Sequence, residues 1–189
     1  MLLPMVDGLL RSQGLTLDQV DGIAFGCGPG SFTGLRIACG VAQGLAFGRH
    51  LHVVGVSTLL ALAEQVDSER VVCCLDARMG EIYHAAYERA GGIWRTVHEA
   101  SLCAPEEAPL LPAGEWTACG DGFAAHEAAL KMRYAGCVSQ FHPNLYPHAR
   151  EIAVLGARQF ERGNGMPPDR ALPVYLRDKV ALRTDERTA

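Results

Sequence analysis

The chain has 189 residues, a formal net charge of −4 and 49% hydrophobic residues, a composition typical of one globular domain or two small lobes. No apolar run reaches the roughly 18 residues that cross a membrane, and the first seven residues lack the basic region of a secretory signal. The acidic balance argues against a broad basic surface for nucleic acid. We therefore expect a cytoplasmic protein without a membrane partner.

Apolar residues recur with helical or strand periodicity along most of the sequence. The predicted elements are, in chain order, a helix over 1–10, a strand over 21–27, a loop over 28–31, a helix over 32–47, a strand over 51–56, a helix over 57–65, strands over 70–75, 81–87 and 93–98, a short helix over 105–111, a strand over 116–119, helices over 123–131 and 148–162, and an extended segment over 172–176. Helices and strands alternate at first, and three strands then follow one another. This order indicates an α/β fold with a mixed sheet.

Seven cysteines are irregularly spaced, and none of them forms a C-x-x-C motif. Most stand beside apolar residues, as in the Val-Val-Cys-Cys-Leu run over 71–75. This pattern predicts buried free thiols in a reducing compartment, and it predicts no zinc site.

A glycine-rich loop stands between the first predicted strand and the helix that follows it. Backbone N–H groups at such a helix start can bind an anion, which makes Gly28, Gly30, Ser31 and Thr33 candidates for a phosphate cradle. Neither the dinucleotide fingerprint nor the P-loop motif is complete, however. The alternative is a tight structural turn in which Ser31 or Thr33 caps the helix.

The helix after this loop carries Gly40, Gly44 and Gly48, one glycine every four residues. Each interior glycine costs about 0.5–1 kcal/mol relative to alanine. Such a row is typical of a helix that another backbone approaches closely. The sequence leaves two partners open, another element of this chain or another subunit.

Two short segments contain side chains that are common in catalysis. The His126-Glu127 pair begins like a zinc-protease helix, but Leu130 stands where the second histidine is needed, so we predict a solvated helix face. The turn over 76–81 holds two acids and one base. It is either an acid–base group or a hairpin with a local ion pair. Neither segment completes an active site.

Five sequence blocks resemble the bacterial TsaB family, also called YeaZ. They are Gly-Pro-Gly-Ser-Phe-Thr-Gly-Leu-Arg-Ile over 28–37, Gly-Leu-Ala over 44–46, Gly-Val-Ser-Thr-Leu over 55–59, Asp-Ala-Arg-Met-Gly-Glu-Ile-Tyr over 76–83 and Pro-Val-Tyr-Leu-Arg over 173–177. The resemblance implies an actin-like (ASKHA, ribonuclease H-like) fold with two lobes, over 1–66 and 67–189. It also allows the C-terminal helix to pack back between the lobes.

The resemblance also implies a function in making N6-threonylcarbamoyladenosine beside the anticodon of tRNA. In this family the subunit TsaD catalyses the transfer, the ATPase TsaE joins it, and ATP and metal belong to these partners. We therefore expect a non-catalytic scaffold with no cofactor of its own. It would pair with TsaD through helices 1–10 and 33–47, form a homodimer when alone, and meet tRNA only through the complex. The expected interface residues are Leu2, Leu3, Val6, Leu9, Leu10, Arg36, Gly40, Val41, Gly44, Leu45 and Gly48.

The sequence departs from the family at its start. Family members open with a strand–hairpin segment, whereas this sequence opens in the helix that follows it. We therefore expect a first lobe without those N-terminal strands, less stable than an upstream-extended form. Two alternative functions are a nucleotide-binding enzyme of the same fold and a glycoprotease-like peptidase, the latter disfavoured by the incomplete zinc motif. Arg36, Arg78 and Arg177 either contact tRNA or TsaD, or pair with nearby acids.

Overall fold

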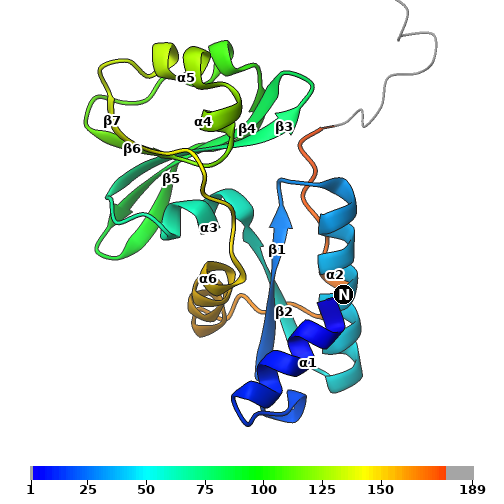
Figure 1. Ribbon diagram of the computed structural model, residues 1–189. Helices are drawn as coiled ribbons and strands as arrows, with labels where there is room; N and C mark the ends of the chain where they lie inside the picture. The colour runs from blue at the N-terminus through cyan, green and yellow to red at the C-terminus, as the bar shows by residue number, and fades with distance from the viewer. Residues whose placement is uncertain (1, 178–189) are drawn as a thin grey trace, which may run out of the picture.

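The computed structural model describes residues 2–177, which fold around two separate sheets (Figure 1). The elements are α1 (Leu2–Ser12), η1 (Leu17–Gln19), β1 (Gly22–Gly28), α2 (Phe32–Arg49), β2 (His52–Ser57), α3 (Thr58–Glu64), β3 (Arg70–Arg78), β4 (Glu81–Ala90), β5 (Ile93–Cys103), η2 (Pro105–Glu107), β6 (Trp116–Cys119), α4 (Gly122–Ala125), α5 (Glu127–Arg133), β7 (Val138–His142), α6 (Ala149–Glu161) and η3 (Pro168–Arg170). No helix within 2–177 combines the length and apolar character needed to cross a membrane.

The first sheet consists of the parallel strands β1 and β2. Figure 1 shows this pair between α2 and α6. Phe25 of β1 and Val53 of β2 pack against Cys39, Ala42 and Ala46 of α2. Because helices cover both faces, these strands are largely apolar rather than alternating.

The helix α6 lies very close to β1. A Cβ atom added at Gly156 of α6 would lie 2.3 Å from the Cβ of Ala24 and 3.3 Å from a methyl of Val54. Only glycine allows this approach, and the helix buries Ile152 and Leu155 against the region around Val56.

The second sheet has five strands in the order β5-β4-β3-β6-β7. The pairs β3–β4 and β4–β5 are antiparallel, whereas β3–β6 and β6–β7 are parallel. Leu59 and Leu62 of α3 pack on one core of this sheet, and Phe123 and Leu130 of α4 and α5 pack on another. The prediction of an α/β fold with a mixed sheet is confirmed.

Two predicted elements differ from those observed, and one observed strand was not predicted. The helix expected over 123–131 is broken at His126, whose backbone (φ −128°, ψ 42°) separates α4 from α5. The helix expected over 105–111 is a single 3-10 turn, because Pro109 follows it closely. The strand β7 was not predicted, because its five residues offer only a short and weak apolar pattern.

Candidate functional site

The helix α1 is amphipathic, yet none of its residues is buried. Leu3 is 53% exposed and Leu9 is 67% exposed, and Leu2 and Met5 are exposed as well. An apolar helix face of this kind gains stability only when something covers it. Within residues 2–177, nothing covers the apolar face of α1.

The helix α2 has two rows of small residues with different surroundings. Ala42 and Ala46 are buried against β1 and β2. A Cβ atom added at Gly40, Gly44 or Gly48 would meet no described atom within 4 Å. Of the two partners that the sequence left open, an element within residues 2–177 is therefore excluded for the glycine row.

The two helices are linked at one end. Asp18 of η1, which follows α1, pairs with Arg49 at the C-terminal end of α2. We call α1 together with the glycine row of α2 the open helical face. Of its predicted interface residues, those with exposed side chains or backbone are Leu2, Leu3, Leu9, Arg36, Gly40, Gly44 and Gly48. The half-buried ones are Val6, Leu10, Val41 and Leu45.

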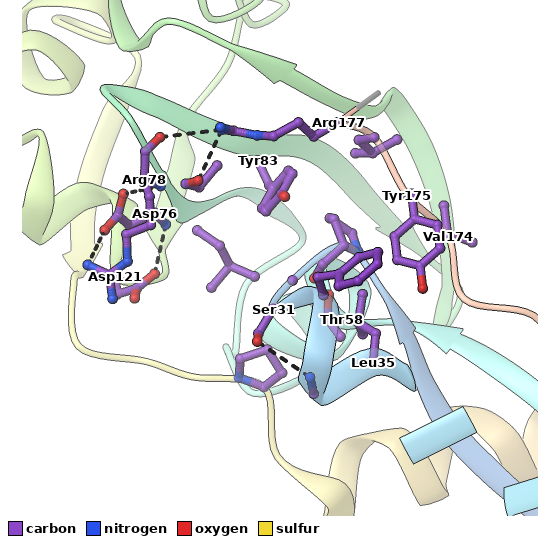
Figure 2. Close-up of a pocket in the computed structure, with 18 of the residues that line it drawn as sticks. Ser31, Leu35, Thr58, Asp76, Arg78, Tyr83, Asp121, Val174, Tyr175 and Arg177 are labelled. Carbon is purple, nitrogen blue, oxygen red and sulfur yellow. Dashed lines mark hydrogen bonds and ion pairs between the residues drawn. The ribbon is translucent and has the colours of Figure 1, made fainter. Parts of the chain in front are cut away.

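A cleft of about 700 Å³ opens elsewhere, between the loop before α2 and the β3–β4 hairpin (Figure 2). Its third wall is formed by residues 174–177 of the extended segment 172–177, which we call the C-terminal strap. The hydroxyl of Thr58 donates to the carbonyl of Pro29 at the base of this loop. Residues of the glycine loop and of the turn over 76–81 both line this cleft, although the two segments are far apart in sequence.

Two residues of the glycine loop have structural roles in this arrangement. The Ser31 hydroxyl accepts a hydrogen bond from the Gly34 N–H at 3.4 Å, which confirms that Ser31 caps α2. Gly28 has φ 124°, and a Cβ there would lie 2.6 Å from the Val174 carbonyl oxygen of the strap. Thr33 is exposed. A role in ligand binding for Gly28, Gly30, Ser31 and Thr33 stays a prediction.

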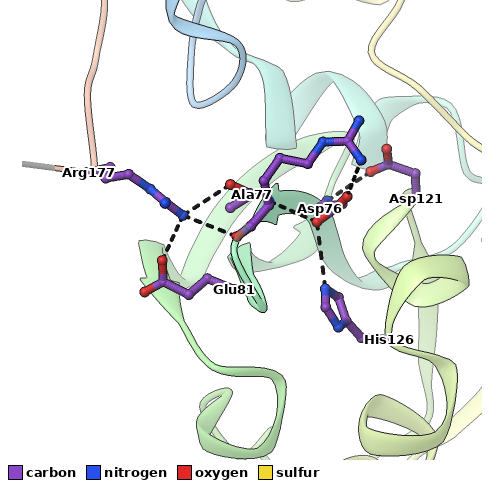
Figure 3. Close-up of polar contacts among 7 residues, drawn as sticks. Asp76, Ala77, Glu81, Asp121, His126 and Arg177 are labelled. Atoms are coloured by element: carbon purple, nitrogen blue, oxygen red, sulfur yellow. Dashed lines mark hydrogen bonds and ion pairs between the residues drawn. The ribbon is translucent and has the colours of Figure 1, made fainter. Parts of the chain in front are cut away.

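The β3–β4 hairpin contains a compact polar cluster (Figure 3). The Asp76 carboxylate pairs with Arg78 at 2.9 Å, which confirms the predicted local ion pair. Asp121 accepts a hydrogen bond from the Asp76 N–H at 3.0 Å. The Nε2 atom of His126 lies 3.6 Å from the Asp76 carboxylate and is buried. The prediction that His126 is solvated is therefore wrong, whereas Glu127 does face solvent and pairs with Lys131.

Arg177 joins the strap to this hairpin. Its guanidinium pairs with Glu81 at 2.7 Å and donates to the Ala77 carbonyl at 3.0 Å. The contact supports a strained turn, because Arg78 and Met79 both have positive φ. Asp121 and the strap residue Tyr175 were missed as parts of this cleft, although Asp121 lies two residues after the end of the parallel strand β6, where site residues gather.

The chemistry that this arrangement offers is modest. Within residues 2–177, no three His, Cys, Asp or Glu side chains are grouped as a metal site. All seven cysteines are free. Burial raises the pKa of Cys73 and Cys74 well above the ordinary value, so these thiols stay protonated and unreactive.

The chain is similar to known proteins over nearly all of its length. A family model described as "TsaD: tRNA N6-adenosine threonylcarbamoyltransferase" matches residues 1–183. The tRNA threonylcarbamoyladenosine biosynthesis protein TsaB of Escherichia coli K12 is 38% identical, with 96% of this chain and 81% of the relative aligned. The protein of the same name from Haemophilus influenzae is 35% identical, with 96% and 80% aligned.

Solved structures agree with these sequence matches. YeaZ from Pseudomonas aeruginosa superposes with a TM-score of 0.84 at 39% identity, covering 93% of this chain and 83% of that one. A crystal structure from the same organism, described as having similarity to peptidase YEAZ, gives a TM-score of 0.85 at 40% identity, with 93% and 82% covered. The chain therefore belongs to the TsaB (YeaZ) family and has its actin-like fold.

Proposed function

We propose that this chain is a non-catalytic subunit of the cytoplasmic machinery that makes N6-threonylcarbamoyladenosine in tRNA. In this proposal it binds a TsaD subunit through the open helical face and supports it. TsaE joins the same complex, tRNA is met through the complex, and ATP and metal are bound by the partners. The support from known proteins is that its relatives are named as biosynthesis proteins of this modification.

The observation that carries the proposal is that α1 buries none of its residues against the described part of the chain. An isolated helix of 11 residues is marginal in water unless its apolar face packs. The glycine row of α2, whose C-terminal end is linked to η1 by the pair of Arg49 and Asp18, leaves room for a second helix to approach. Both features are those of a surface that is completed by a partner.

Mixing experiments test this pairing directly. We expect light scattering on a sizing column to show a one-to-one complex when the chain is mixed with its cognate TsaD. The chain alone should form a homodimer through the same face. If the chain fails to bind TsaD under conditions where each protein is folded, the proposal is wrong.

A leucine at Gly44 should separate folding from binding. Because the added side chain meets no described atom, the free energy of unfolding should rise by about 0.5–1 kcal/mol through better helix propensity. The affinity for TsaD should fall by about 100-fold, since the side chain fills the space that the partner needs. Urea unfolding and calorimetric titration measure the two effects.

The matched control is an alanine at Gly156, the other close-approach glycine. There the added Cβ meets Ala24 within the chain, so the free energy of unfolding should fall by about 1–3 kcal/mol. Binding to TsaD by the folded fraction should not change. If Gly44→Leu destabilises the isolated chain as Gly156→Ala does, the glycine row packs inside the molecule and the proposal loses its support.

The cleft favours a second candidate, a nucleotide-binding protein of the same fold. Its volume of about 700 Å³ is large enough for a small ligand. Titration of the chain alone with ATP and Mg²⁺ distinguishes the two functions. No heat of binding is expected for the scaffold, whereas binding together with turnover would favour the enzyme.

A further inference from the structure

The open helical face carries more positive than negative side chains. Its cations are Arg11 and Arg36, and its single acid is Asp7. Asp7 is already paired with Arg11 at 3.1 Å. The helix α2 contains neither Asp nor Glu. Among the described residues, Arg36 is therefore a cation on this face without an acidic partner.

The neighbouring acids do not reach Arg36. Asp18 is paired with Arg49 at the C-terminal end of α2, whereas Arg36 lies in the first turns of that helix. Asp21 directly precedes β1, at the end of the strand opposite the loop that leads into α2. Within residues 2–177 no acid pairs with Arg36, so its charge is available to a carboxylate on another molecule.

Arg36 is also held in one orientation. Its guanidinium lies over the Phe32 ring, 4.0 Å from the centroid, and its Nε donates to the Tyr175 hydroxyl at 3.0 Å. The two terminal amino groups have no hydrogen bond to residues 2–177. A guanidinium fixed at Nε offers these groups to a carboxylate at a reduced entropic cost.

Given the proposed function, we propose that Arg36 selects the partner of the open helical face. A heterologous helix that places a carboxylate opposite Arg36 is preferred over a second copy of this chain. Each face of a homodimer would carry a net charge of +1, and neither Arg36 would find an unpaired acid among the described residues of the two faces. Burying a charge without a partner disfavours the homodimer, and a carboxylate on the other subunit favours the heterodimer.

Replacement of Arg36 by methionine tests this selection, with cognate TsaD as the probe. Methionine keeps an apolar stem without the charge. We expect the affinity for TsaD to fall at least tenfold and homodimerisation, measured by analytical ultracentrifugation, to tighten about tenfold. Wild-type binding to TsaD should weaken between 50 and 500 mM NaCl, on the order of several-fold, and the variant should lose this dependence.

Two further variants separate the charge of Arg36 from its shape and test the charge argument at Asp7. Arg36→Lys keeps the charge and should retain a weak homodimer. Asp7→Asn removes the acid paired with Arg11 and raises the net charge of each face from +1 to +2, so homodimerisation should weaken further. Equal weakening of both dimers by Arg36→Met, or a homodimer that tightens with Asp7→Asn, would overturn the inference. If wild-type chain does not bind TsaD at all, the proposed function fails, and the homodimer measurements still test the charge argument.

Discussion

Replacing Glu64 with alanine is expected to lower the free energy of unfolding by about 3 kcal/mol. The Glu64 side chain is only 10% exposed and lies at the end of α3. Its carboxylate accepts a hydrogen bond from the Trp94 indole at 2.6 Å and pairs with Arg89 at 3.4 Å and Arg158 at 2.9 Å. Removing the acid leaves partly buried cations without a partner, which typically costs several kcal/mol.

The loss should also loosen the two sheets relative to each other. Arg158 belongs to α6, which packs on β1 and β2, whereas Arg89 and Trp94 belong to β4 and β5. Urea unfolding followed by tryptophan fluorescence measures the change, since Trp94 reports on the site itself. The control is Glu127→Ala, which removes an exposed pair with Lys131 and should leave the midpoint unchanged. Equal effects of the two substitutions would contradict the role of Glu64.

The chain should lose about 2–3 kcal/mol of stability between pH 6.5 and pH 4.5 because of His84. This side chain is fully buried in the second sheet, and neither ring nitrogen has a hydrogen-bond partner among residues 2–177. Burial, with a smaller effect from nearby His98, lowers the pKa of His84 from 6.5 to about 3. Below pH 6.5 His84 is protonated in the unfolded chain but stays neutral in the folded chain. The free energy of unfolding therefore falls as the pH is lowered, until the pH reaches the pKa of the folded state.

A leucine at position 84 should remove this part of the pH dependence. At neutral pH the variant should be at least as stable as the wild type, because two buried nitrogen atoms without hydrogen bonds are lost. Urea unfolding of both proteins at several values between pH 7.5 and 4.5 gives the comparison. Parallel curves over that range would show that His84 takes up a proton in the folded chain as readily as in the unfolded chain, which would contradict its lowered pKa.

The sequence predicted the parts of the fold that depend on local pattern. The strand, glycine loop and helix over 21–47 are local, since the loop chemistry and the Ser31 cap act within a few residues. The break at His126 lies instead where its side chain comes within 3.6 Å of Asp76, which is distant in the chain. Tertiary contacts of this kind override a helical pattern, so they could not be predicted.

The candidate surfaces were predictable to different degrees. The apolar periodicity of 1–10 predicted a helix, and the glycine spacing in α2 predicted a close approach, but whether these faces are covered depends on the whole fold. The cleft brings Asp121 and Tyr175 beside the turn over 76–81. These residues come from segments that no short motif connects. The charge imbalance around Arg36 is likewise visible only in the folded chain, where Asp7 pairs with Arg11 and Asp18 pairs with Arg49.

The arrangement of the strap and α6 has a consequence for synthesis of the protein. The second sheet uses a continuous stretch, from Arg70 to His142. The first sheet, although it begins at Gly22, needs Leu155 of α6 and the hydrogen bond from the Val174 N–H to the Cys27 carbonyl at 2.7 Å. During translation, β1 and β2 therefore leave the ribosome before α6 and the strap, which complete their packing, have been synthesised. We therefore expect the second sheet to fold before the first sheet is complete, and the N-terminal segment to be the part exposed to aggregation in the interval.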